Sequence, residues 1–271
     1  MIIDWIKSET LLIKIIREAG DAVLEEYNKE SDYQIKDDNS PLTKADLISH
    51  KIILKGLTEF FPQFPILSEE SSENFILDNP DKTFWCVDPV DGTKEFIERN
   101  GEFTINISLI SKMEPILGLV LIPASNILYT AFKSMGAFKI IEEKKEKITV
   151  KKSLNQLTFA VSKSHINNKT KLFISQFKKN SLKSVGSSIK LCLVAEGIVD
   201  CYPRMGPTSL WDIAAGHCIV NEAGGFIKDE EGNVLTYDVS RSYLNKNFIA
   251  QSAAFLKMYE DDINKYYLNN Y

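Results

Sequence analysis

Apolar residues recur at helical spacing over residues 5 to 27, and charged residues occupy many of the positions between them. A stripe of this period predicts an amphipathic helix that buries one face against a core. A second pattern of the same kind runs from Leu47 to Phe60. The apolar face of the first predicted helix consists of Ile6, Ile13, Ile16, Ala19, Val23 and Tyr27.

The second predicted helix has a recognisable start signal. Thr43 is followed three positions later by Asp46, which is the spacing of a capping box with Asp in place of the usual Glu. Helix capping alone is therefore a sufficient explanation for Asp46 at this point.

The middle of the chain predicts a sheet. Residues 103 to 109 alternate strictly between apolar and polar side chains, which is the strongest strand pattern in the sequence. The short apolar runs Ile66–Leu67 and Phe84–Val87 have strand length, and acidic residues follow each of them. Two further strands are expected at Gly118–Ile122 and Ile127–Phe132, with Pro123 and Asn126 in the turn between them.

A stretch rich in lysine and glutamate, residues 142 to 152, is typical of a solvated hairpin or junction. We take it as the boundary between an N-terminal α+β half, residues 1–150, and a C-terminal α/β half, residues 151–271. The expected fold is an α/β (α+β) layered sandwich of alternating helices and sheets. In the second half we expect a strand at Phe159–Val161, helices at Ser187–Ala195 and Trp211–Ala223, a helix stop at Gly224–Gly225 and a strand near Phe248.

Composition narrows the class of function. The chain has 271 residues, of which 44% are hydrophobic and 25% charged, as in ordinary globular proteins. Its net charge of −5, with basic residues spread along the chain, argues against binding of a nucleic acid polymer. With three histidines, and four cysteines that form no CxxC pair, a metal site would have to use carboxylates, which favour hard cations such as Mg²⁺.

No segment predicts insertion into a membrane. The longest apolar run, Ile116–Ala124, is far shorter than the ~20 residues of a spanning helix. Asp4, Lys7 and Glu9 interrupt the apolar residues at the start of the chain, so that no secretory signal is expected there. A cytoplasmic protein is the expectation.

Carboxylates follow predicted strands or open a predicted helix at three places in the sequence. Glu69 and Glu70 follow the first short strand, Asp88 and Asp91 follow the second, and Asp212 begins the helix near residue 211. Clustered carboxylates repel one another unless a cation neutralises them, and oxygen is the ligand that Mg²⁺ prefers.

The segment DPVDGT, residues 88–93, is the most informative of the three. Asp88 and Asp91 flank a rigid proline and could turn toward one point, while Gly92 and Thr93 begin a predicted helix whose free N–H groups suit a phosphate. In isolation an ordinary turn with an Asp cap explains the motif equally well. The acidic residues elsewhere favour a metal site beside an anion site.

Longer motifs resemble a known family. LSEES, WCVDPVDGTKEFIERNGEFTINISLI and GSSIKLCLVAEGIVDCYPRMGPTSLWDIAAGH are similar to the lithium-sensitive, magnesium-dependent phosphatases of the inositol monophosphatase superfamily. DPxDGT and WDxxAG mark the superfamily. NSPxTxAD, DGTKEFIxRNGEFTxNI, GSSxKxCLVAEG and YPRxGPT resemble its branch of bacterial 3′(2′),5′-bisphosphate nucleotidases, of the CysQ type. The resemblance implies the layered inositol monophosphatase/fructose-1,6-bisphosphatase-like fold.

The resemblance also implies a metal centre. It places two or three Mg²⁺ ions on Glu69, Asp88, Asp91, Asp212 and the backbone carbonyl of Val90. Asp46, Glu69 and Thr93 correspond to the family's catalytic residues, and Asp46 with Thr93 orients and deprotonates the attacking water. Gly92 and Thr93 match residues that hold the phosphate being cleaved, and no phosphoenzyme is expected. Glu70 is either a residue that supports the metal ligands without binding the metal itself or an ordinary surface glutamate.

Residues of the second half are implied to select the substrate. Ser187, Lys190 and Arg204 match ligands of a retained phosphate, and His165 lies beside the nucleoside in the family. A solvated helix lysine and a loop surface charge are the ordinary alternatives for Lys190 and Arg204. We interpret His217 as a residue that packs in the core or supports the metal ligands without binding metal. We interpret His50 as a surface helix residue. The full set implied to contact substrate is Glu69, Val90, Asp91, Gly92, Thr93, His165, Ser187, Lys190, Arg204 and Asp212.

The implied reaction is hydrolysis of adenosine 3′,5′-bisphosphate to AMP and phosphate, and of its sulfated precursor, in sulfur assimilation and nucleotide recycling. Lithium is the implied inhibitor, and some relatives are peripheral at the cytoplasmic face of the inner membrane. One alternative is an inositol monophosphatase or sugar bisphosphatase on the same scaffold. A non-catalytic sensor of nucleotide or metal is another, and the intact acidic set argues against it.

Overall fold

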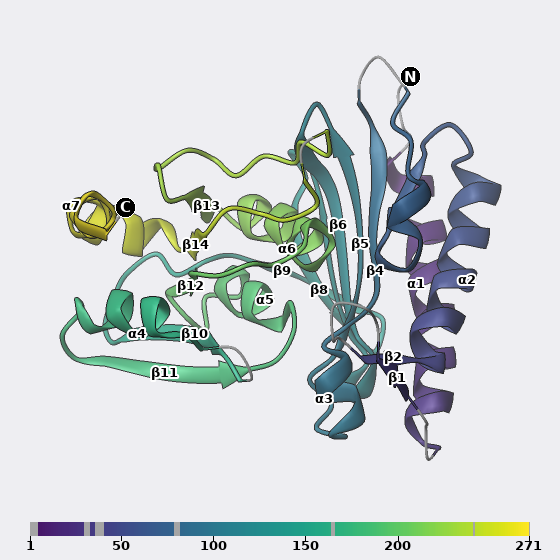
Figure 1. The fold of residues 1–271 in the computed structure, drawn as a ribbon, viewed down its shortest axis with the longest axis horizontal. Coiled ribbons are helices and arrows are strands. Elements are labelled where there is room, and N and C mark those ends of the chain that lie inside the picture. The colour runs from purple at the N-terminus through teal and green to yellow at the C-terminus, as the bar shows by residue number, and fades with distance from the viewer. Residues whose placement is uncertain are drawn as a thin grey trace.

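The computed structural model describes residues 5–29, 33–35, 41–78, 82–163, 166–240 and 242–270. Helical layers and sheets alternate through the molecule, as expected from the sequence (Figure 1). The helices α1 (Trp5–Tyr27) and α2 (Lys44–Phe60) cover the outer face of a seven-stranded sheet. The helices α5 (Ile189–Ala195) and α6 (Leu210–Glu222) lie between this sheet and a five-stranded one.

The seven-stranded sheet runs in sequence order, β3-β4-β5-β6-β7-β8-β9. All neighbouring strands are antiparallel except β3 and β4, which are parallel. The strands are β3 (Ile66–Ser68), β4 (Phe84–Asp91), β5 (Thr104–Ser111), β6 (Glu114–Ile122), β7 (Ile127–Phe132), β8 (Gly136–Ile141) and β9 (Lys144–Ile148). The predicted strands are therefore confirmed, and the charged stretch near residue 142 does form a hairpin.

Strand β5 buries its polar face as well as its apolar face. Its alternation would ordinarily place Thr104, Asn106 and Ser108 in solvent, but all three are buried because α5 and α6 cover that side. The Ser108 hydroxyl donates to the carbonyl of Leu117, and Thr104 and Asn106 both contact Ser188. A buried polar face of this kind supplies the hydrogen bonds that the site next to it needs.

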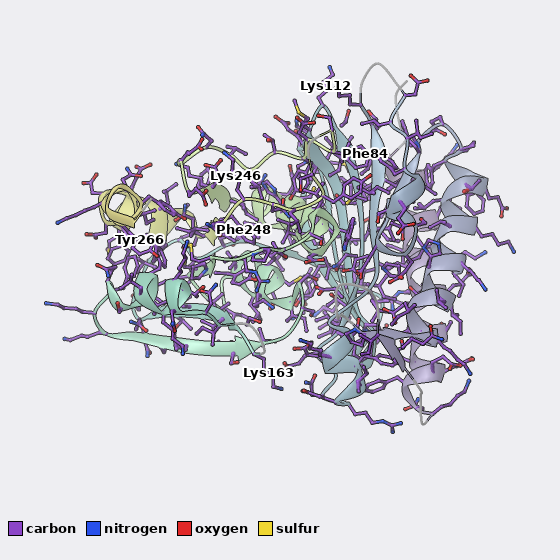
Figure 2. All side chains as sticks on the ribbon, viewed as in Figure 1. Phe84, Lys112, Lys163, Lys246, Phe248 and Tyr266 are labelled. Atoms are coloured by element: carbon purple, nitrogen blue, oxygen red, sulfur yellow. The ribbon has the colours of Figure 1, made fainter. Side chains whose placement is uncertain are left out.

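Sequence order is lost in the five-stranded sheet, where the strands lie in the order β11-β10-β12-β14-β13. The structure confirms the expected strands β10 and β14 and the expected helices α5 and α6. The sequence did not predict β11, β12, β13, α4 or α7. The helices α4 and α7 pack on the outer face of this sheet, where Tyr266 belongs to the core and Phe248 points to the opposite side (Figure 2). The bounds are β10 (Leu157–Ser162), α4 (Asn168–Ser175), β11 (Asn180–Val185), β12 (Cys201–Arg204), β13 (Phe226–Asp229), β14 (Phe248–Gln251) and α7 (Ala253–Asn270).

Short elements complete the chain. They are β1 (Tyr33–Ile35), β2 (Pro41–Thr43), α3 (Thr93–Ile97) and 3₁₀ turns at Glu69–Asn74 and Pro123–Ser125. None of the helices among the described residues is long and apolar enough to cross a membrane. The boundary at residue 150 remains a prediction, since one hydrophobic core combines residues from both sides of it.

Helix α6 approaches strand β6 very closely. A Cβ atom at Gly118 would lie 2.2 Å from the carbonyl oxygen of Ala215, so only glycine fits at this crossing. The obstacle is backbone, which cannot turn aside as a side chain can. Because α6 carries Asp212, this contact also sets the distance of that carboxylate from β4.

Replacement Gly118→Ala should therefore lower the free energy of unfolding by about 1–3 kcal/mol, as overpacking does in other cores. Gly20→Ala is the matched control, because the atom nearest to its new Cβ would be the side-chain end of Leu121, at 2.5 Å, and no backbone atom would be close. Urea denaturation of both variants measures the difference. Equal stability of the two variants would contradict the argument.

Candidate active site

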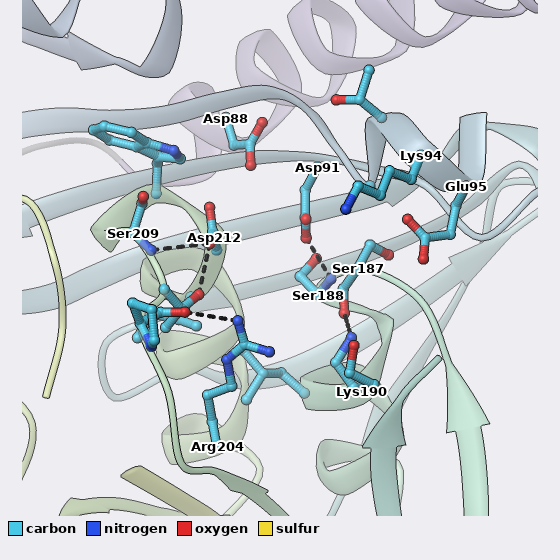
Figure 3. A pocket seen from close by; sticks show the side chains of 18 of the residues that line it. Asp88, Asp91, Lys94, Glu95, Ser187, Ser188, Lys190, Arg204, Ser209 and Asp212 are labelled. Atoms are coloured by element: carbon cyan, nitrogen blue, oxygen red, sulfur yellow. Dashed lines mark hydrogen bonds between the residues drawn. The ribbon is translucent and has the colours of Figure 1, made fainter. Parts of the chain in front are cut away.

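A cavity of about 710 Å³ opens between the two sheets, and both halves of the chain line it. Figure 3 shows the carboxylates of Asp88, Asp91 and Asp212 on one side and the cations of Lys190 and Arg204 on the other. Of the sequence-predicted site residues, those that line the cavity are Glu69, Asp88, Val90, Asp91, Gly92, Thr93, Ser187, Lys190, Arg204 and Asp212.

Three carboxylates converge closely enough to hold one ion. Glu69, Asp88 and Asp212 each offer a ligand oxygen, and these atoms lie within 4.8 Å of one another. They come from three elements: the 3₁₀ turn after β3, strand β4 and helix α6. The fold therefore brings together the acidic residues that lie far apart in the sequence.

This cluster is electrostatically unfavourable without a cation. Burial raises the pKa of Asp88 well above its usual range, and the charges of Glu69 and Asp91 raise it further. Burial also raises the pKa of Asp91, to about 7, and the charge of Asp212 adds to the effect. Such a set favours a bound positive charge at neutral pH.

Strand β4 changes register where the two aspartates lie. Asp88 pairs with Asn106 and Asp91 with Thr104, so that β4 carries an irregularity between them that includes Pro89. An irregularity of this kind bends a strand and re-aims its side chains, and it accommodates proline. The Ser49 hydroxyl donates to the Pro89 carbonyl at 2.8 Å, which fixes the bend from helix α2.

Asp212 belongs to a second capping box. It is the third residue of α6, and its Oδ2 accepts hydrogen bonds from the Ser209 N–H at 3.0 Å and from the Thr208 hydroxyl at 2.6 Å. The cap occupies one carboxylate oxygen and leaves the other for a ligand. Ser209 three positions before Asp212 has the spacing of a capping box, so this helix start is also encoded in the sequence.

Asp46 divides its two oxygens in the same way. Oδ2 accepts from the N–H and the hydroxyl of Thr43, at 2.8 and 2.5 Å, which confirms the predicted capping box. Oδ1 accepts from the Thr93 hydroxyl at 3.5 Å, and that hydroxyl also reaches the Val90 carbonyl at 3.3 Å. Capping and the implied catalytic role are therefore compatible in one side chain.

Asp91 is tied to the second half of the chain. Its Oδ2 accepts the Ser188 N–H at 2.5 Å and the Thr104 hydroxyl at 3.4 Å. The Ser188 hydroxyl in turn bonds to Thr104 and to the Asn106 amide oxygen, both at 2.8 Å. Ser188, which the sequence analysis did not single out, thus joins the turn before α5 to the acidic wall.

Lys190 is buried, and the alternative of a solvated helix lysine is wrong. Its side chain is 5% exposed, its ammonium group donates to the carbonyls of Val185 and Ser187, and it lies 5.4 Å from the centre of the Tyr202 ring. Burial lowers the pKa of Lys190 to about 8, although the charge of Asp91 opposes this shift.

Arg204 is half-buried on β12 and donates to the Pro207 carbonyl at 2.7 Å.

The sequence matches the Inositol monophosphatase family over residues 7–266. The chain belongs to this family. It is 42% identical over 237 residues to the 3′(2′),5′-bisphosphate nucleotidase CysQ of Escherichia coli K12, covering 87% of this chain and 96% of that one. It is also 42% identical over 255 residues to CysQ of Buchnera aphidicola from Acyrthosiphon pisum, covering 92% of this chain and 95% of that protein.

Solved structures of family members have the same fold. CysQ from Bacteroides thetaiotaomicron aligns with a TM-score of 0.79 at 35% identity, over 91% of this chain and 97% of that one. An inositol monophosphatase from Thermotoga maritima aligns with a TM-score of 0.77 at 26% identity, over 95% of each chain. The expected layered fold is thereby confirmed.

Members of the inositol monophosphatase family use divalent metal ions, and the residues of this cavity fit such ions. The donors are carboxylate oxygens, which suit hard divalent cations, and none of the three clustered side chains is a softer histidine or cysteine ligand. The raised pKa of Asp88 has the same implication. The acidic wall is therefore the candidate metal centre.

The two histidines that the structure describes lie in different surroundings. His50 is half-buried on α2 and bonds to the Ser68 hydroxyl at 2.9 Å, so it is a helix residue, as expected, but only partly at the surface, because α2 packs over the end of β3. His217 is fully buried against the Tyr237 hydroxyl at 2.9 Å, as expected of a packing residue. His165 lies outside the described residues. Glu70 is half-buried and lies outside the cavity lining.

Several other residues of the cavity lining carry no local sequence signal of a functional role. Glu95 and Thr208 are buried polar residues of this kind, and only their burial in the folded chain distinguishes them from ordinary turn or helix residues. The lining residues without a predicted role include Lys94, Glu95, Asn167, Ser188, Tyr202, Thr208 and Ser209.

His217 should make the protein sensitive to acid. Burial lowers its pKa to about 3, whereas the unfolded chain binds this proton near pH 6.5. Because the unfolded state then holds more protons, the free energy of unfolding falls as pH falls from about 6.5 toward 3, by about 2 kcal/mol at pH 5. In His217→Gln, this loss between pH 7 and pH 5 should be smaller by that amount in urea titrations. Parallel pH profiles of the two proteins would contradict it.

Proposed function

We propose that this chain is a magnesium-dependent 3′(2′),5′-bisphosphate nucleotidase that hydrolyses adenosine 3′,5′-bisphosphate to AMP and phosphate. The observation that carries the proposal is one cavity with an acidic wall facing two cations, Lys190 and Arg204. A substrate with two phosphates can place one at the acidic wall and the other at the cations. The similarity to CysQ proteins over nearly their whole length supports the same assignment.

In this proposal the residues that would hold two or three Mg²⁺ ions are Glu69, Asp88, Asp91, Asp212 and, through its carbonyl, Val90. Such ions would neutralise the phosphate charge and activate water. Lithium inhibits by taking one of their places. The sulfated precursor of adenosine 3′,5′-bisphosphate carries the same ribose phosphate and is a second substrate, which places the activity in sulfur assimilation.

The protein residues orient the reaction. Thr93 donates its hydroxyl proton toward Asp46 and accepts a hydrogen bond from the attacking water, so that the proton of this water passes toward Asp46. The N–H groups at Gly92 and Thr93, where α3 begins, hold the phosphate that is cleaved. The bond from phosphorus to the ribose oxygen breaks as the water oxygen attaches, and the released alkoxide takes a proton from a second water molecule. Ser187, Lys190 and Arg204 hold the retained phosphate, and His165 contacts the nucleoside.

The metal requirement should be tested with Asp91→Asn. The amide keeps an acceptor for the Ser188 N–H but loses the charge that holds a cation, so kcat/KM for adenosine 3′,5′-bisphosphate should fall by about 100-fold or more. Glu98→Gln, an exposed change on the same segment, is the control and should retain activity. Phosphate release is measured with Mg²⁺ and with excess chelator. Full activity in chelator would refute the proposal.

The role of the two cations should be tested with the double variant Lys190→Met, Arg204→Met. Methionine preserves the packing of the buried lysine stem, while each lost charged contact should cost about 1.5–3 kcal/mol, or one to two decades in kcat/KM. Adenosine 3′-monophosphate lacks the second phosphate, so its hydrolysis should fall far less. Lys183→Met, exposed on β11, is the control.

An equal loss of kcat/KM on both substrates would mean that Lys190 and Arg204 do not bind a second phosphate. Faster hydrolysis of inositol phosphates than of either nucleotide by the unaltered protein would favour the inositol monophosphatase alternative.

A further inference from the structure

Glu95 is a buried carboxylate to which neither the metal centre nor the proposed reaction assigns a role. It lies on α3, two residues after Thr93, lines the cavity and is 6% exposed. Burying a charge of this kind is costly unless polar partners compensate it. Its place on the wall of the cavity makes substrate a candidate partner.

The backbone around Glu95 provides a fitted space for its side chain. A Cβ atom at Gly186 would lie 2.6 Å from Glu95 Cγ, so the glycine makes room for the glutamate. A Cβ atom at Gly92 would lie 3.3 Å from Glu95 Oε2. The carboxylate therefore lies between the turn at residues 91–93 and the turn at residues 186–188, and Figure 3 shows it beside Ser187.

These two turns belong to different parts of the proposed site. The first holds the phosphate that is cleaved, and the second leads to Lys190 and the retained phosphate. Glu95 adjoins both turns, as its close approaches to Gly92 and Gly186 show. Glu95 thus lies between the positions of the two phosphates.

A carboxylate in that position repels phosphate, so the group it can accept from substrate is a neutral donor. In a nucleoside 3′,5′-bisphosphate the ribose lies between the two phosphates, and its 2′-hydroxyl is the one free hydroxyl there. A carboxylate offers about four acceptor positions, so it can accept this donor while it also has partners within the protein.

We propose that Glu95 accepts a hydrogen bond from the ribose hydroxyl next to the phosphate that is cleaved, and thereby selects ribonucleotides over 2′-deoxyribonucleotides. The inference rests on the proposed nucleotidase function. It adds a specificity residue outside the metal centre and outside the two cations.

The test compares kcat/KM for adenosine 3′,5′-bisphosphate and for its 2′-deoxy analogue, both with Mg²⁺. The unaltered protein should prefer the ribose substrate by about ten-fold or more, which is the ordinary effect of a hydrogen bond to a charged group. In Glu95→Ala this ratio should fall to about one. Glu95→Gln keeps an acceptor oxygen and should retain part of the preference, whereas Glu98→Ala, which removes an exposed charge nearby, should retain all of it.

A loss that is equal on both substrates would overturn the inference, because Glu95 would then serve the fold or position Lys190. An unaltered protein that does not distinguish the two substrates would overturn it as well, while the nucleotidase function would stand. An unaltered protein that hydrolyses neither substrate would refute the proposed function and this inference together.

Discussion

The mutual repulsion of clustered carboxylates is the constraint on which the site depends. Asp88 is buried and Asp91 and Asp212 are half-buried on the cavity wall. Burial raises the pKa of all three, and neighbouring negative charges raise the pKa values of Asp88 and Asp91 further. The fold holds them there by binding one oxygen of each to a protein donor: the Val90 N–H for Asp88, the Ser188 N–H for Asp91 and the Ser209 N–H for Asp212. The acidic wall is thus fixed in advance for a cation.

These donors come from both halves of the chain, so the site exists only when the layers are packed together. Ser188 precedes α5, which lies between the two sheets, yet its N–H and hydroxyl bond to residues of β4 and β5. Helix α6 packs directly against β6 at Gly118, because the backbone of α6 at Ala215 leaves no room for a side chain there. The packing of the middle helical layer therefore sets the spacing of the metal ligands.

Local patterns predicted the local elements, and the family motifs predicted the site. The helical stripe before residue 27, the capping box at Thr43 and the strand at residues 103–109 depend on neighbouring residues and were found in the structure. The burial of Lys190 and the contact of His50 with Ser68 depend on segments far apart in sequence, which a local pattern does not encode. The roles of the individual site residues remain predictions.

The two capping boxes show why a structural explanation and a functional one need not compete. A helix cap needs one carboxylate oxygen, and Asp46 and Asp212 each give Oδ2 to the start of a helix. The cap fixes the rotamer of the side chain and so the direction of its other oxygen, which reaches Thr93 from Asp46 and is left for a ligand in Asp212. A capping aspartate is therefore a precise way to aim a carboxylate, because the rigidity of the helix is passed on to the ligand atom.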